Sequence, residues 1–515
     1  MSALLGGQNA IETRHRKLSV KTKLLFASGG LQEAVVSAGG IVTVLFYNQV
    51  LGISAALAGT AFLIASIVDA VSDPLIGAIS DSFRSRWGRR HPFMFASALP
   101  IAISFYFLYQ PVEGLSETGY FVWLVTFLIL LRLSQTFYLI PHDALGAELT
   151  DDYEERSLIF GYNSVAVSLL SILTASVVSL VILPTTPGTD HGFLNEAGYF
   201  VLAVTGSITI FFSVVLCSLG MIHQLPYLHD QHYQLDLNKV LSFRAYLVQF
   251  VALFRNISYL ATCISLLILY VGLGIIAVVA TYAYIYVYEL SAEAITWASI
   301  AKTPGVFIAL PLLVFLSKRM EKKSIIIIST VIMSLMIALP HNLRLLDLFP
   351  ANDSTFILVG LFVPLFLGYM LFPVSAIVLD SQLADIADQH ELNTGYRSEG
   401  IIFSARSFGI KSTTGIGGFI AGFGLEHIGF PENAEVGALM QETITGLLVL
   451  NGPVYMCIYL IAAGCMAFYQ LDRNSHNQIL RKLESRRGDR EEIYASPGQR
   501  DSWVDRWNPF KKDSY

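Results

Sequence analysis

The chain has 515 residues, of which 54% are hydrophobic and 14% are charged, and its mean hydropathy is +0.57. Soluble domains carry about 25% charged residues, so this composition excludes an ordinary soluble globular protein and indicates an integral membrane protein. The net charge of −6 carries little information, because charge in membrane proteins informs through its position along the chain.

Twelve apolar segments follow one another along the chain. Each is close to or above the roughly 20 residues that a helix needs to cross a bilayer. They lie at about 24–49, 54–80, 92–110, 119–147, 158–183, 197–222, 257–287, 293–316, 324–340, 355–385, 400–428 and 443–470. We therefore expect an all-α polytopic membrane protein with twelve transmembrane helices in two six-helix bundles.

The positions of basic residues predict the orientation and the domains. Lys and Arg gather in the N-terminus and in the loops after helices 2 and 8, whereas the loops on the other side contain Arg344 alone. The positive-inside rule therefore places both termini in the cytoplasm, with the helices in the plasma (inner) membrane. The predicted regions are a cytoplasmic N-terminus (1–23), an N-terminal bundle (24–222), a cytoplasmic linker (223–256), a C-terminal bundle (257–470) and a cytoplasmic tail (471–515).

The two halves resemble each other at an offset of six helices. Basic turns follow helices 2 and 8, and acidic turns, AELTDDYEERS and DSQLADIADQHELNTGYRSEG, follow helices 4 and 10. Weak internal symmetry of this kind is typical of transporters built from repeats. An ion channel would more often show one pore module per chain, so the symmetry favours a transporter.

Two carboxylates, Asp69 and Asp73, stand inside the second apolar segment. Their i, i+4 spacing places both on one face of a helix, one turn apart. Because a charge inside the membrane is costly, such residues indicate function by default, here a site for Na⁺ or for protons. The alternative is a structural role, in which both aspartates pair with basic residues to hold helices together.

Helices 1 and 4 add further polar groups inside the membrane. Glu33 lies midway along helix 1 beside Gln32, where it could bind a polar solute or be neutralised by an arginine. Arg132 and Tyr138 stand on helix 4, and Arg132 could pair with Glu33 or with an aspartate of helix 2. We expect Pro141 to break helix 4.

Helix 11 carries Arg406 and Lys411. A lysine inside the bilayer needs a partner, and its natural partners are Asp69 and Asp73. If Lys411 competes with a cation for these carboxylates, it takes part in coupling.

An alternating run of tyrosines closes helix 7, at Tyr282, Tyr284, Tyr286 and Tyr288. Such a run could line a cavity or form an aromatic belt at the membrane surface. Tyrosine is enriched at the membrane interface, so we favour the belt.

Three stretches of the chain resemble the glycoside–pentoside–hexuronide:cation symporters, a family of the major facilitator superfamily that includes the melibiose permeases. They read DAVSDPLIGAISD…RWGRRHPF, IPHDALGAELTDDYEERS and ADIADQHELNTGYRSEGIIFSARSFGIK. The resemblance extends from about Lys21 to Gln470. It implies the major facilitator fold, a central cavity between two bundles, and alternating access by rocking.

The resemblance also implies roles for individual residues. In the melibiose branch two helix-2 aspartates bind the coupling Na⁺, Li⁺ or H⁺, and they align with Asp69 and Asp73. A helix-4 threonine of the cation site aligns with Thr136, and a helix-11 lysine aligns with Lys411. A helix-1 acidic residue that binds sugar aligns with Glu33.

The sugar-binding half of the family's site departs further. Leu139 replaces an aspartate shared between sugar and cation, Asp143 replaces a tryptophan that stacks on sugar, and Ser164 replaces a sugar-binding arginine. The resemblance therefore implies a largely retained cation site and a changed substrate.

The turn after helix 2 resembles the superfamily's loop motif and predicts a cytoplasmic gate. We expect Asp81 to face the start of helix 11, where the helix dipole favours an anion. We expect Arg89 or Arg90 to meet Glu154 or Glu155 when the gate is closed.

The function expected from these observations is cation-coupled symport of a sugar or glycoside, with no cofactor besides the Na⁺ or H⁺. The substrate-binding residues would be Gln32, Glu33, Arg132, Tyr138 and Arg406. The loss of an acid at Leu139, with Arg132 and Arg406 retained, favours a uronide over a neutral galactoside.

Two alternatives stay open: a cation-coupled carrier of a lysophospholipid or another amphiphile, and, less favoured, a membrane sensor that transports nothing. No catalytic triad, phosphate-binding loop or metal cluster is recognisable, so we expect no enzyme. We expect membrane lipid but no nucleic acid as a partner, and function as a monomer.

Overall fold

The computed structural model describes residues 17–83, 85–150, 152–185, 191–227, 253–302, 304–394 and 399–495. These residues form helices joined by short loops, and none of them forms a strand. Ten helices among the described residues are long and apolar enough to cross a membrane. One further helix, Glu399–His427, stands where the sequence predicts helix 11. Two shorter helices, Ala292–Lys302 and Pro304–Ser317, stand where it predicts helix 8. The all-helical membrane architecture expected from the sequence is confirmed.

The N-terminal bundle begins with a first transmembrane helix in three pieces, interrupted near Ser28 and ending in a π-helical turn. These pieces are α2 (Val20–Ala27), α3 (Gly30–Leu45) and η1 (Phe46–Val50). The bundle continues with α4 (Ala55–Ser82), α5 (His91–Tyr109), α6 (Glu117–Glu148), α7 (Tyr153–Val177) with η2 (Val178–Ile182), η3 (Gly192–Leu194), α8 (Glu196–Gly220) and η4 (Ile222–Tyr227).

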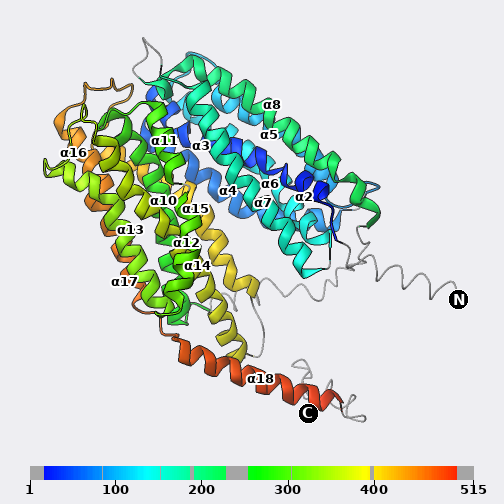
Figure 1. Ribbon diagram of the computed structural model, residues 1–515. Helices are drawn as coiled ribbons and strands as arrows, with labels where there is room; N and C mark the ends of the chain where they lie inside the picture. Colours follow the sequence, from blue (N-terminus) through cyan, green and yellow to red (C-terminus); the bar gives the residue numbers. More distant parts are fainter. Residues whose placement is uncertain are drawn as a thin grey trace, which may run out of the picture.

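The C-terminal bundle repeats this arrangement (Figure 1). Its helices are α10 (Ile257–Tyr286), α11 (Ala292–Lys302), α12 (Pro304–Ser317), α13 (Lys322–Leu345), α14 (Ile357–Thr394), α15 (Glu399–His427), and α16 (Gln441–Val449), η5 (Leu450–Val454) and α17 (Tyr455–Met466) in series. A final helix, α18 (Arg473–Ala495), lies outside the bundle. Helix α14 extends nine residues beyond the predicted end at 385, through the acidic segment that the sequence suggests is a turn.

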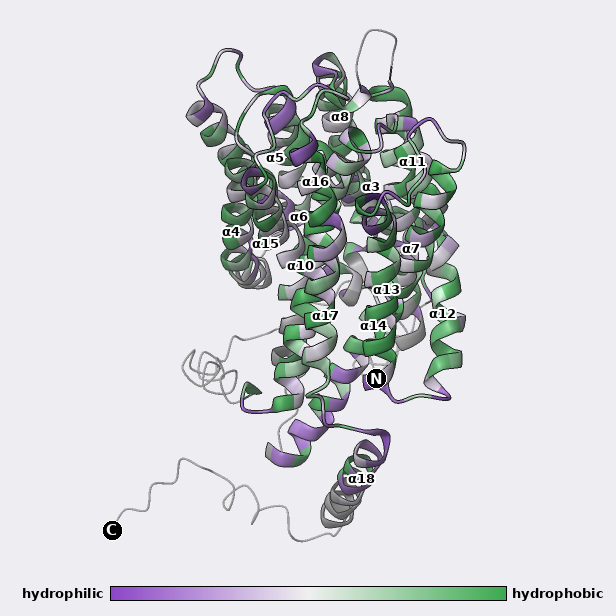
Figure 2. Cartoon of the chain, turned by 90° about the vertical axis from the view of Figure 1, so that its left-hand side faces the viewer, coloured by the Kyte–Doolittle hydropathy of each residue, from purple (hydrophilic) through white to green (hydrophobic). Residues whose placement is uncertain are grey.

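Side-chain caps and apolar stripes explain where these helices begin and how they face lipid. The hydroxyl of Ser54 accepts the backbone N–H of Leu57 at the start of α4, which satisfies a donor that lacks a partner within the helix. Further along α4, Ile67, Val71 and Leu75 form an i, i+4 stripe, each 57–61% exposed. Figure 2 shows hydrophobic residues along the middle of the helices and hydrophilic residues at their ends. This pattern is the one expected of helices whose middle parts are surrounded by lipid.

Helix α6 does not end at Pro141, contrary to the expectation from the sequence. It runs without a break from Glu117 to Glu148, with Pro141 inside it. A proline removes one backbone donor, but membrane helices tolerate this when neighbouring groups compensate.

The two bundles approach each other most closely along α4 and α15. A Cβ atom on Gly59 would stand 2.6 Å from the carbonyl oxygen of Gly418, and one on Gly422 would stand 2.2 Å from that of Ala55. Glycine at these positions lets the two backbones touch, as small residues do in membrane helix pairs.

At the end of the molecule where the first transmembrane helix finishes, hydrogen bonds join the bundles. The hydroxyl of Tyr282 donates to Asn48 Oδ1 and that of Tyr286 to Gln49 Oε1, each over 2.9 Å. Gln49 Nε2 also donates to the carbonyl of Pro431 over 3.0 Å. We call this end the closed end.

The aromatic belt predicted for the tyrosine run is therefore wrong. Tyr282, Tyr284, Tyr286 and Tyr288 are at most 6% exposed. Tyr282 and Tyr286 lie four residues apart, so they share the face of α10 that meets the N-terminal bundle.

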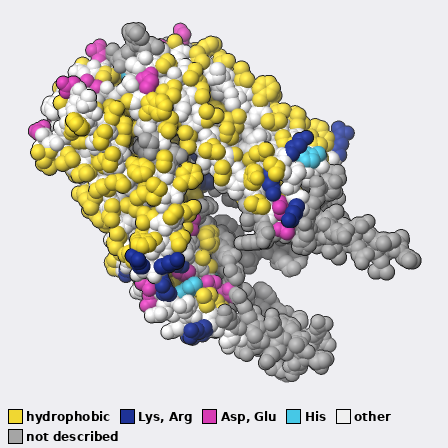
Figure 3. All heavy atoms as spheres, in the orientation of Figure 1, with side chains coloured by type: hydrophobic (Ala, Val, Ile, Leu, Met, Phe, Trp, Pro, Cys, Tyr) yellow, Lys and Arg dark blue, Asp and Glu magenta, His cyan; other side chains and the backbone are white. Residues whose placement is uncertain are grey.

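At the opposite end the bundles diverge. Figure 1 shows the two bundles separating towards α18, and the space-filling view in Figure 3 shows a recess between them. Here Leu18, Arg90 and Glu148 bind partners within their own bundle. We call this end the open end.

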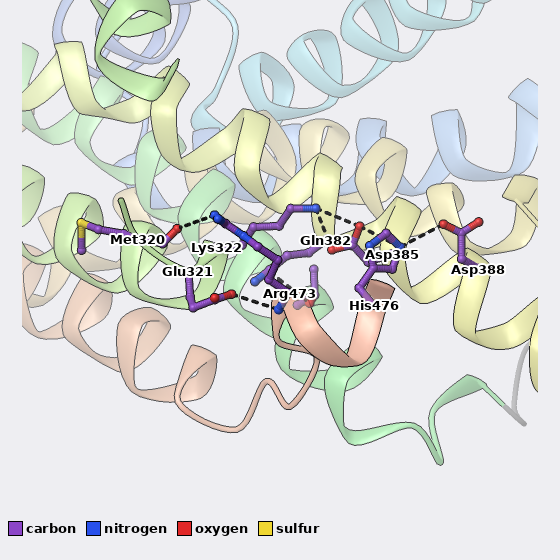
Figure 4. Close-up of polar contacts among 9 residues, drawn as sticks. Met320, Glu321, Lys322, Gln382, Asp385, Asp388, Arg473 and His476 are labelled. Atoms are coloured by element: carbon purple, nitrogen blue, oxygen red, sulfur yellow. Dashed lines mark hydrogen bonds and ion pairs between the residues drawn. The ribbon is translucent and has the colours of Figure 1, made fainter. Parts of the chain in front are cut away.

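Helix α18 docks on the open end of the C-terminal bundle (Figure 4). His476 Nε2 lies 3.1 Å from Asp388 Oδ2 of α14, and the backbone N–H of Arg473 donates to Glu321 over 3.1 Å. Ile479 and Leu483 are buried against the core, one turn apart. The sequence predicts only a cytoplasmic tail here, because charged residues are frequent in this segment.

Candidate ion and substrate site

The two intramembrane aspartates of α4 each have a partner on α6. Arg132 Nη1 lies 3.1 Å from Asp69 Oδ2, and Thr136 donates its hydroxyl to Asp73 Oδ1 over 3.0 Å. The i, i+4 spacing repeats on both helices, so Arg132 stands beside Asp69 and Thr136 beside Asp73, one turn on.

Lys411 completes this group from the other bundle. Its ammonium forms an ion pair with Asp73 Oδ2. The structure thus brings together all four residues that the sequence assigns to the coupling cation, and it adds Arg132, which the sequence places in the substrate site.

The site is enclosed at one side and open at the other. Asp69 is 5% exposed and its Oδ1 atom, which is buried, has no hydrogen-bond partner. The side chain of Lys411 is 37% exposed, and that of Asp73 is 19% exposed. Asp73 is therefore the more exposed of the two carboxylates.

Two of the residues predicted to bind substrate are buried inside the N-terminal bundle instead. Gln32 is 0% exposed and accepts a hydrogen bond from Gln135 Nε2 over 3.2 Å. Tyr138 is also 0% exposed, and its hydroxyl packs against Gly29. Both side chains are fully buried in this conformation, so their role in substrate binding stays a prediction. Their polarity alone could not reveal which face of the helix they occupy.

The Glu33 side chain is exposed, and Asp143 provides a second exposed carboxylate near it. Asp143 lies seven residues beyond Thr136, so both stand on the same face of α6. The Asp143 side chain is 64% exposed and lies within electrostatic range of Glu33. The sequence singled out Asp143 only as a departure from the resembled family; its spacing from Thr136 was the available signal.

A buried histidine supports Asp143 from behind. His142 is 2% exposed, its Nδ1 atom lies 3.6 Å from Asp143 Oδ1, and its Nε2 atom lies 3.1 Å from the carbonyl oxygen of Phe26. Its ring stacks on Phe26 with the ring centroids 4.0 Å apart. This packing holds the His142 ring against α2, directly beside Asp143.

The predicted substrate residue Arg406 lies on α15, but its side chain is outside the part of the chain that the structure describes. The side chains of Asp81 and Glu154, predicted for the gate, also lie outside it.

The remaining gate residues bind other partners than those predicted. Arg89 Nη2 and Arg90 Nη2 both contact Glu148 Oε1, over 3.1 and 2.9 Å. Glu155 instead accepts from Lys23 over 2.8 Å and from the backbone N–H of Leu18. The bond from Lys23 lowers the pKa of the Glu155 carboxyl below its ordinary value. The expected contact of Arg89 or Arg90 with Glu155 is therefore not made here, and the residues in these contacts all belong to one bundle.

The C-terminal bundle holds the counterpart of this ionic contact. Lys322, the first residue of α13, binds both carboxylate oxygens of Asp385 on α14, over 2.8 and 2.7 Å (Figure 4). In each half, a basic residue that follows the second transmembrane helix therefore binds an acidic residue towards the end of the fourth. The internal symmetry seen in the sequence is a symmetry of contacts.

A separate apolar groove lies on the opposite face of α6. Its volume is about 470 Å³, and Phe83, Phe93 and Phe137 are among the residues that line it. Phe137 follows Thr136 by one residue and so points away from the aspartates. The groove is thus distinct from the ion site.

Comparisons with known proteins identify the family. The MFS/sugar transport protein family matches residues 25–473. The chain is 26% identical to the isoprimeverose transporter of Lactiplantibacillus pentosus, over 83% of this chain and 84% of the relative. It is 24% identical to the putative glycoside/cation symporter YagG of Escherichia coli, over 91% and 95%, and 23% identical to that organism's glucuronide carrier protein homolog, over 92% and 97%.

Among solved structures, that of the D-xylose-proton symporter covers 87% of this chain and 96% of its own, with a TM-score of 0.57 and 16% identity. At this identity the likeness shows the fold alone. Because the family match spans nearly all of both bundles, the chain belongs to the MFS/sugar transport family, among the glycoside–pentoside–hexuronide:cation symporters.

Proposed function

We propose that this protein is a secondary active transporter that couples the entry of a sugar or glycoside to that of Na⁺ or H⁺. The observation that carries the proposal is the ion pair between Asp73 and Lys411, because it joins the two bundles at an intramembrane carboxylate. A cation that binds Asp73 competes with Lys411 and thereby acts on the contact between bundles. Such a site links ion occupancy to the conformational equilibrium.

The transport cycle follows from this competition. Both termini face the cytoplasm, as the basic loops indicate, so the recess opens inward and the closed end faces outward. When the cation leaves Asp73, Lys411 takes its place, and the empty carrier rocks without an uncompensated charge inside the membrane.

The substrate face favours a neutral polyol. Glu33 and Asp143 are exposed there, and carboxylates are good acceptors for several hydroxyl donors. The argument for a uronide rested partly on the charge of Arg132, and Asp69 already engages that charge. We therefore place glycosides first and test uronides beside them.

The experiment is uptake into proteoliposomes by the purified protein. The panel contains isoprimeverose, neutral methyl glycosides, a methyl glucuronide and a lysophospholipid, each with Na⁺ and H⁺ gradients imposed separately. Concentrative uptake of a glycoside supports the proposal. Transport of the lysophospholipid alone would replace it with the amphiphile carrier, and no transport of any member of the panel would contradict it.

Glu33→Gln and Asp143→Asn sharpen the test of the substrate face. For a neutral glycoside, each variant should raise KM at least several-fold, because each removes an acceptor charge from the site. For a uronide each should lower KM instead, since like charges then no longer face each other. Asp353→Asn, in an exposed loop, is the matched control and should leave KM unchanged.

A further inference from the structure

Asp69 already has a cation supplied by the chain itself. The guanidinium of Arg132 lies 3.1 Å from its Oδ2 atom, and Asp69 is 5% exposed. An arginine side chain stays protonated at every physiological pH. The negative charge of Asp69 is therefore neutralised without any dissolved ion.

The two ion pairs of the site differ in which bundles they join. Arg132 and Asp69 belong to α6 and α4 of the same bundle, so their pair persists while the bundles rock as bodies. Lys411 comes from the other bundle, so its pair with Asp73 responds to rocking. Asp73 is therefore the carboxylate whose charge compensation can change during transport.

A sodium ion fits this arrangement poorly. Hard cations such as Na⁺ need several oxygen ligands. Of the four carboxylate oxygens, Arg132 holds Oδ2 of Asp69, Thr136 and Lys411 hold both oxygens of Asp73, and Oδ1 of Asp69 alone has no partner. Displacing Lys411 frees one oxygen, yet Arg132 remains beside the ion. Na⁺ and H⁺ would add the same charge here, so the two ions differ in the number of oxygen ligands that each needs.

A proton needs far less from the same residues. It requires one carboxylate oxygen, and the exposed side of Asp73 offers a route from water. We propose, on the basis of the symport function above, that Arg132 takes the place of a metal ion at Asp69 and that H⁺ is the coupling ion, carried on Asp73. Binding forms one O–H bond on Asp73, Lys411 keeps its own proton, and the transported proton returns to water on the cytoplasmic side.

The first test needs no substrate. Thermal unfolding of the purified wild type in NaCl and in choline chloride at equal ionic strength should give the same Tm. Arg132→Ala exposes the charge of Asp69 and should gain a Na⁺-dependent rise in Tm of at least about 2 °C, because a ligand that binds only the folded state stabilises it.

Two matched variants separate this effect from a general change in the fold. Arg132→Lys keeps a tethered cation and should show no response to Na⁺. Arg132→Ala combined with Asp69→Asn removes both charges and should lose the response again. A Na⁺-dependent rise in Tm in the wild type would overturn the proposal, and this measurement stands even if Arg132→Ala does not fold.

The second test uses proteoliposomes with isoprimeverose and methyl glucuronide as the probes. A gradient of one pH unit should drive up to about tenfold accumulation at one proton per sugar, because one pH unit is a tenfold concentration ratio. A Na⁺ gradient at constant pH should drive none. Accumulation driven by Na⁺, or facilitated transport that ignores the pH gradient, would each overturn proton coupling.

Failure of the symport function itself gives a different result. If neither probe enters under any gradient and neither exchanges in counterflow, the proposed substrate class is wrong. The test of Na⁺ binding to the wild type and to Arg132→Ala then still decides whether Arg132 occupies the metal site.

Discussion

Asp73 is the residue at which α4 contacts both α6 and the other bundle. Its two oxygens bind Thr136 and Lys411 separately. Asp73→Asn retains an acceptor for Thr136 but loses the charge, so we expect the protein to fold and to exchange sugar in counterflow. Gradient-driven accumulation should fall to a ratio of about one, because the variant has no site for the coupled ion. Concentrative uptake at the wild-type level, with normal expression, would remove Asp73 from the coupling site.

Glu155 offers a residue-scale test outside the membrane. Its bond from Lys23 lowers its pKa below the ordinary value of 4.5 in the folded state. The carboxylate therefore stabilises the fold fully above pH 4.5, and this contribution is lost as the pH falls below that value. Wild type should exceed Glu155→Gln in Tm at neutral pH, and the gap should close in acid. A gap that is constant with pH would mean that charge pairing with Lys23 contributes nothing.

At the scale of helices, the contact of α4 with α15 depends on glycine. A Cβ on Gly59 would meet backbone atoms of Gly418 and Phe419 at 2.6 and 3.0 Å, and a backbone cannot move aside as a side chain can. Gly59→Ala should weaken this contact between bundles by about 1–3 kcal/mol and shift the carrier away from the inward-open state. The reactivity of a cysteine at Ser54 towards an impermeant reagent should then rise.

The control for this variant lies on the same pair of helices. A Cβ on Gly424 of α15 would make ordinary contact with Leu450, at 3.5 Å. Gly424→Ala should therefore leave the reactivity at Ser54 unchanged. Equal effects of the two substitutions would mean that helix propensity, rather than close approach, explains the result at Gly59.

The docking of α18 is a second property of an element. His476 lies between two acids of α14, 3.1 Å from Asp388 and 3.5 Å from Asp385 (Figure 4). His476→Gln weakens this contact, so trypsin should cleave after Arg481 and Lys482 several-fold faster, because cleavage follows the undocked population. Asn477→Ala, an exposed position on the same helix, is the control. Unchanged cleavage in His476→Gln would assign the docking to Ile479 and Leu483 alone.

Helices were predictable from the sequence because their signal is local. A span of apolar residues long enough for the bilayer identifies α4 or α10 without any knowledge of its neighbours. Partners between helices were predictable only where charge restricts the choice, as for Lys411 with Asp73. Gln32 and Tyr138 could not be placed, because a hydroxyl or amide is tolerated both in a bundle interior and in a cavity.

The same limit explains the pairing of Arg132. An intramembrane arginine must find a carboxylate, and Glu33 and Asp69 were equally possible until α4 and α6 were positioned. The prediction of an aromatic belt from the tyrosine run of α10 is wrong for a related reason. An aromatic belt and a contact between bundles use the same residue type, and the hydrogen bonds to Asn48 and Gln49 lie more than 200 residues away in the chain.

On the scale of the whole molecule, alternating access requires the closed end to open. Gln49 is central to that end, because its side chain binds Tyr286, Pro431 and the backbone N–H of Ala434. These bonds must break together when the recess closes and the outer side opens. The closed end is therefore the place where a covalent link should arrest the cycle rather than unfold the protein.

We predict that Gln49→Cys combined with Ala434→Cys, joined by a short thiol-reactive cross-linker, traps the carrier inward-open. The Gln49 Oε1 atom lies 2.9 Å from the Ala434 nitrogen, so the link fits the observed state. Transport should fall at least about tenfold, which corresponds to raising the free energy of opening the closed end by about 1.4 kcal/mol or more. It should recover when a reductant cleaves a linker that contains a disulfide. The pair Val287→Cys and Asn352→Cys is the control. Asn352 Nδ2 lies 3.0 Å from the carbonyl oxygen of Val287, and both residues belong to one bundle, so they need not separate during transport. Undiminished transport in the Gln49–Ala434 pair, with complete cross-linking, would show that this end stays closed throughout the cycle and that substrate passes by another route.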